Sequence, residues 1–118
     1  MIGLDRLMKK PGVVVAGQFS DDGKTIRFTG HVPEKVVKSM SRICAENNIH
    51  MRTEVIQMAD ISGLKMTPLN GWMIWCGKYA IFVVDNTGII VETKRADFNQ
   101  LMVDMFVSGP TGPRLMPS

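Results

Sequence analysis

Three apolar segments in the second half of the chain follow one another with only short turns between them. They span residues 72–76, 79–84 and 89–91, and Gly77-Lys78 and residues 85–88 separate them. Turns this short join antiparallel strands, because a parallel crossover needs a dozen residues or more. The segments are apolar at both odd and even positions, which predicts that both faces of the sheet are covered. This part of the chain is therefore expected to form an antiparallel sheet between two layers.

The first half of the chain predicts two further strands and a short helix. A β-branched run over residues 12–20 and an alternating run over residues 24–29 are joined by a turn in which Gly23 can adopt a positive φ. Residues 2–9 have a short amphipathic pattern that Pro11 ends. Apolar residues at helical spacing predict a last helix over residues 96–107.

The longest periodic segment begins at Pro33-Glu34 and is predicted to end near Ser62-Gly63. The pair Asn47-Asn48, halfway along, leaves open whether the segment is one helix or two. On a helical wheel, eight apolar residues fall within an arc of about 120°, which predicts a core-facing stripe. These residues are Val36, Val37, Met40, Ile43, Cys44, Met51, Val55 and Met58.

A second, thinner row of apolar residues lies on another side of the same helix. Ala45, Ile49 and Ile56 fall near roughly 180–220° on the wheel, where a monomer would expose them to water. Single exposed apolar side chains are ordinary on protein surfaces, so the row by itself leaves a monomer open.

The composition excludes several classes of protein. A chain of 118 residues with 45% apolar and 21% charged residues is typical of one globular domain. Its longest apolar run is strand-sized, far below the roughly 20 residues that span a bilayer, and the N-terminal residues lack a signal-peptide pattern. The basic residues are scattered, which favours a solvated surface over nucleic-acid binding. Cys44 and Cys76 are predicted to be reduced and buried, as in a cytoplasmic protein.

No signature of a common catalytic site is present. Gly23-Lys24-Thr25 lacks the first glycine of a phosphate loop, since Gln18 occupies that position, and it leads into a strand rather than a helix. We therefore expect no catalytic residue and no cofactor.

The potential metal ligands are also few. Apart from the carboxylates they are Cys44, Cys76, His31 and His50, which predict no metal site, because Cys44 and His50 lie about 120° apart around one helix. Cys76, beside a turn, is the better candidate of the two cysteines for a reactive thiol.

Four local motifs resemble those of a known family. They are Leu4-Asp5-Arg6-Leu7-Met8 before Pro11-Gly12-Val13, Phe19-Ser20-Asp21-Asp22-Gly23-Lys24, Thr67-Pro68-Leu69-Asn70-Gly71-Trp72, and Val91-Glu92-Thr93 before Ala96-Asp97-Phe98. Together with the order of the elements, they resemble an uncharacterised prokaryotic branch of the roadblock / dynein light-chain family over about residues 2–107. The resemblance implies a profilin-like α/β sandwich. In that fold a five-stranded antiparallel sheet has a long helix on one face and two helices on the other.

The resemblance also implies a homodimer, because in roadblock domains the long helix and the third strand typically meet their symmetry mates. Trp72 and Trp75 should point to opposite faces of a strand, one into the core and the other toward an interface. The expected interface consists of Ala45, Ile49, Arg52, Ile56, Met73 and Trp75.

The expected function is a non-enzymatic, dimeric interaction module in the cytoplasm. By family analogy its partner is a small GTPase or another regulatory protein, with no role for nucleic acid or membrane. One alternative is a small-molecule sensor or carrier, and another is a redox protein that uses Cys76. The domain is expected to span residues 1–107, followed by a flexible tail over residues 108–118 in which Leu115 and Met116 are candidate docking residues.

Overall fold

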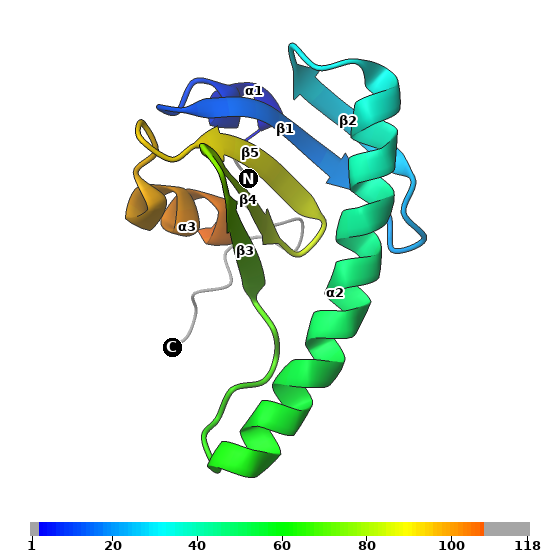
Figure 1. The fold of residues 1–118 in the computed structure, drawn as a ribbon, viewed down its shortest axis with the longest axis vertical. Helices are drawn as coiled ribbons and strands as arrows, with labels where there is room; N and C mark the ends of the chain where they lie inside the picture. The colour runs from blue at the N-terminus through cyan, green and yellow to red at the C-terminus, as the bar shows by residue number, and fades with distance from the viewer. Residues whose placement is uncertain (1–2, 108–118) are drawn as a thin grey trace.

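The computed structural model describes residues 3–107, and it contains one five-stranded antiparallel sheet with helices on both faces (Figure 1). In chain order the elements are α1 (Leu4–Met8), β1 (Val13–Phe19), β2 (Thr25–Gly30), α2 (Glu34–Ser62), β3 (Gly71–Cys76), β4 (Tyr79–Val84), β5 (Thr87–Glu92) and α3 (Phe98–Val107). The strand order across the sheet is β2-β1-β5-β4-β3. The predicted fold and its helix and strand order are confirmed. The predicted tail, residues 108–118, lies outside the described residues.

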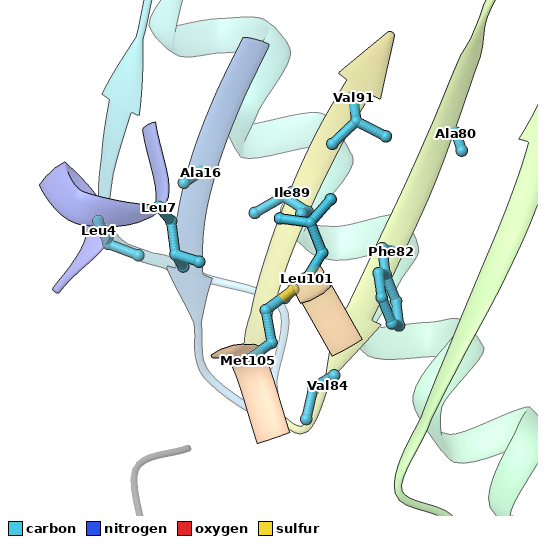
Figure 2. Close-up of a cluster of buried hydrophobic side chains, with 10 residues drawn as sticks. All are labelled: Leu4, Leu7, Ala16, Ala80, Phe82, Val84, Ile89, Val91, Leu101 and Met105. Carbon is cyan, nitrogen blue, oxygen red and sulfur yellow. The ribbon is translucent and has the colours of Figure 1, made fainter. Parts of the chain in front are cut away.

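One face of the sheet is covered by the two short helices. Leu4 and Leu7 of α1 and Leu101 and Met105 of α3 point onto the sheet (Figure 2). The strands contribute Ala16, Ala80, Phe82, Val84, Ile89 and Val91 to the same cluster. Burial of these side chains, at about 25 cal/mol per Å² of apolar surface, holds α1 and α3 on this face.

The long helix α2 covers the other face, where the core is smaller. Its buried members are Phe19, Cys44, Ala45, Trp72 and Val83. The first half of α2 contacts β1 and β2, while its second half extends beyond the end of the sheet, as Figure 1 shows in green. The connection after α2 runs back along the helix to β3.

α2 is one continuous helix of 29 residues, so Asn47-Asn48 does not interrupt it. It begins directly after Pro33 and ends at Gly63, whose φ of 72° closes the last turn in the left-handed region. Asn48 is tolerated inside the helix because its side chain is buried and bonded to groups of the sheet.

The buried face of α2 differs from the predicted stripe. Val36, Ile43 and Met58 are exposed, whereas Ser41 and Asn48 are buried. The contact face is rotated by roughly 80° from the predicted one. The wheel was centred on apolar residues alone, but both polar side chains have partners in the sheet and lie in the middle of the contact.

Candidate interaction surface

The edge strand β3 carries the most exposed apolar side chains of the sheet. It lies at the end of the strand order and pairs with β4 alone among the described strands. Met73, Ile74 and Trp75 are 49%, 46% and 75% exposed. The strand sequence GWMIWC contains no charged residue and no proline, and these are the residues that usually protect an edge strand from further pairing. The edge is therefore chemically suited to pair with another strand.

The first two residues of β3 are held by close packing. A Cβ at Gly71 would lie 2.5 Å from the carbonyl oxygen of Val83, so only glycine allows β3 to approach β4 there. The next residue, Trp72, is buried against α2. The predicted division of the two tryptophans is confirmed, since Trp72 lies in the core and Trp75 is exposed.

The alternation of a strand places the exposed residues of β3 on both faces of the sheet. Because Trp72 faces α2, Ile74 shares that face, while Met73 and Trp75 lie on the face that carries α3. Met73 and Trp75 line a shallow groove there together with Phe98.

On the α2 face, a second groove separates α2 from β3. Ile43, Asn47 and His50 line its helix side, and Ile74 and Ile81 line its strand side. The flank of α2 that faces β3 therefore includes Ile43, which is half exposed. We call the exposed residues Ile43, Ile74, Met73 and Trp75 the β3-edge surface.

The α2 residues that the sequence predicts for the interface lie away from the β3-edge surface. Ile49, Arg52 and Ile56 are exposed, but at 100° per residue they lie on the flank of α2 opposite Ile43 and His50. The structure does not bring this row together with Met73 and Trp75. The prediction that Ala45 faces outward is wrong, because its side chain is 4% exposed and packs beside Trp72 and Val83 in the core.

Asn48 holds α2 in place relative to β3. Its Nδ2 donates a hydrogen bond to the carbonyl oxygen of Asp85 at 2.8 Å, and its Oδ1 accepts one from Trp72 Nε1 at 2.6 Å. The amide thus satisfies buried polar groups of the β4–β5 turn and of β3 at once. Sequence reasoning considered Asn48 only as a helix breaker. The available signal was its position four residues after Cys44, just beyond the edge of the predicted apolar arc.

The two cysteines have different surroundings. Cys44 is buried as predicted, and the loss of hydration raises the pKa of its thiol to about 11. It therefore stays protonated and unreactive at neutral pH. Cys76 is exposed at the end of β3, so the prediction that it is buried is wrong. An edge strand leaves its last side chain without a covering layer.

The turn that superficially resembles a phosphate loop is the β1–β2 hairpin connection. Gly23 has a φ of 89°, and its amide donates to the carbonyl oxygen of Ser20 at 2.9 Å. The Ser20 hydroxyl hydrogen-bonds to Asp22, which lowers the pKa of that carboxyl group. The turn leads from strand to strand, as predicted.

Other chemistry is sparse in the part of the chain that the structure describes. Among residues 3–107, no group of three or more His, Cys, Asp or Glu side chains could hold a metal ion. None of the described helices combines the length and apolarity that crossing a membrane requires. The pocket between α2 and the sheet measures about 50 Å³, compared with about 300–1,000 Å³ for typical small-molecule sites.

The fold is that of a roadblock domain. The structure matches the crystal structure of a Roadblock/LC7 domain from Streptomyces avermitilis with a TM-score of 0.72 and 16% sequence identity, over 86% of this chain and 84% of that one. It matches Myxococcus xanthus MglB with a TM-score of 0.66 and 16% identity, over 86% and 82% of the two chains. A structure of MglB with a tetrameric arrangement matches with a TM-score of 0.66 and 10% identity, over 86% and 76%.

The chain belongs to the family described as "Uncharacterized conserved protein (DUF2173)", whose model matches residues 3–106. A search of curated proteins returned no match. The expected resemblance to an uncharacterised roadblock-like branch is therefore confirmed.

Proposed function

We propose that this protein is a non-enzymatic, homodimeric regulatory module of the cytoplasm that acts by binding other proteins. The observation that carries the proposal is the β3-edge surface. An uncharged edge strand with three successive exposed apolar side chains lies beside an exposed apolar flank of the long helix.

A second copy of the chain is the occupant that this surface fits best. A strand can pair with its own symmetry mate in antiparallel fashion about a twofold axis, and twofold dimers are the commonest assemblies. Such pairing satisfies the free backbone edge of β3 and brings Ile74 and the Ile43 flank toward their mates on the α2 face. Because β3 carries no charge, two copies do not repel each other there.

The partner of the dimer is proposed to be a small GTPase or another regulatory protein. This part of the proposal is supported by the resemblance to roadblock proteins, a fold-level analogy.

Sedimentation velocity on purified protein tests the dimer and its interface together. We expect the wild-type chain to sediment with twice the monomer mass at micromolar concentration. The Ile43→Asp/Ile74→Asp variant should sediment as a folded monomer, because pairing would bury two carboxylates without partners.

One double variant and one single variant separate this interface from its alternatives. Ile49→Asp/Ile56→Asp changes the opposite flank of α2. If the interface lay on the row predicted from the sequence, this variant would also dissociate the dimer. Ile26→Asp changes an exposed isoleucine on β2, at the opposite edge of the sheet, and should leave the dimer intact. A wild-type chain that sediments as a monomer would overturn the proposed dimer. Dissociation by Ile49→Asp/Ile56→Asp alone would move the interface to that flank.

A further inference from the structure

A large apolar groove lies on the face of the sheet opposite α2, between α3 and the β3–β4 edge. Its volume is about 570 Å³. Its apolar lining includes Met73, Phe82, Phe98, Met102, Val103 and Phe106. Met73, Met102 and Val103 are each about half exposed. A patch of this kind on a small domain marks a site that something else covers.

Neither the core nor the proposed dimer covers this groove. The inward side of α3 is used by Leu101 and Met105, as Figure 2 shows, which leaves Met102 and Val103 on its outer side. Pairing of β3 with a mate extends the sheet sideways by about 4.8 Å per strand and does not add a layer above its face.

The chain continues directly from this site. α3 ends at Val107, next to the groove residue Phe106, and eleven further residues follow with the sequence SGPTGPRLMPS. Seven residues separate Val107 from Leu115. Extended, they reach about 25 Å, whereas α3 itself is only about 15 Å long. Leu115 and Met116 can therefore reach any part of the groove.

The composition of this segment complements the groove. Pro110 and Pro113 have the P-x-x-P spacing of segments that bind aromatic grooves in an extended conformation, at little entropic cost. The groove supplies aromatic and methionine side chains, and the amides of Asn70 and Asn99 at its margins can bond to an extended backbone. Attachment to α3 gives the segment a local concentration in the millimolar range, so a weak contact suffices.

We propose that residues 108–118 bind the α3–β3 groove of their own chain, with Leu115 and Met116 packed against Met102 and Val103. A partner protein that binds this groove must first displace the segment. The inference concerns the face of the sheet opposite α2, and Met73 is the one member of the β3-edge surface that also lines this groove.

Methionine-methyl NMR on the full chain tests the proposal. In protein labelled with ¹³C at the methionine methyl groups, the Met102 signal of the Leu115→Asp/Met116→Asp variant should shift from its wild-type position. The signal of Met58, an equally exposed methionine on α2, should stay unchanged. A synthetic peptide of residues 108–118 added to the variant should return the Met102 signal toward its wild-type position, and the same peptide with both aspartates should not.

Two results would overturn the proposal. Identical Met102 signals in the wild type and the variant would mean that the segment does not bind the groove, which would then be open to another protein. Return of the labelled variant's Met102 signal after addition of unlabelled wild-type chain would assign the segment to the groove of a second copy. We expect neither.

Discussion

At the scale of single residues, a buried amide connects three parts of the fold. Asn48 of α2 donates to the β4–β5 turn and accepts from the indole of Trp72. A buried polar side chain is stable only when its partners are present, so removal of the amide leaves the indole N–H and the Asp85 carbonyl without this partner.

We expect Asn48→Ala to lower the free energy of unfolding by about 2–4 kcal/mol. The neighbouring Asn47→Ala is the control. Asn47 is only half-buried, so its replacement should change stability by less than about 0.5 kcal/mol. Urea denaturation of both variants measures the difference. Equal stabilities would contradict the structural role of Asn48.

Residue-level predictions succeeded where a simple periodicity applies. The spacing of Trp72 and Trp75 gave their opposite placement, and the turn chemistry at Gly23 gave its positive φ. Cys76 and Ala45 were misplaced. The burial of each depends on what packs over it: Cys76 lies on an edge strand without a cover, and Ala45 lies against Trp72 and Val83.

At the scale of secondary-structure elements, α2 consists of two parts with different support. Residues up to Val55 supply the buried side chains of the helix, whereas the part beyond it exposes Ile56, Met58 and Ile61. Most helical stability in proteins comes from packing of an apolar face, so the second part is expected to depend on an external contact.

Hydrogen exchange on the wild-type chain tests the difference between the two parts. We expect the amides of residues 56–62, whose apolar side chains are exposed, to exchange faster than those of residues 37–48, which pack on the sheet. Equal protection of the two segments would mean that the end of α2 is as stable as the part that packs on the sheet.

At the scale of the whole molecule, one chain folds around two cores while leaving the β3-edge surface open. The domain described by residues 3–107 is a complete sheet with two covered faces. Its free edge explains why the proposed stable unit is a pair of chains rather than one chain.

Thermal unfolding provides a test at this scale. If the folded state is a dimer and the unfolded state a monomer, Tm should rise by about 2–4 °C for each tenfold increase in protein concentration. The Ile43→Asp/Ile74→Asp variant should show a Tm that does not depend on concentration. A wild-type Tm that stays constant from about 1 to about 100 µM would contradict dimerisation.

The sequence by itself determined the elements, their order and the antiparallel sheet, because these follow from local periodicity, short turns and capping residues such as Pro33 and Gly63. The motifs around Gly23 and Gly71 further identified the family. Only the tertiary structure decided which side of α2 is buried and which flank lies beside β3. The physical reason is that Ser41 and Asn48 are polar, and their burial is favourable only with the partners that the folded sheet supplies.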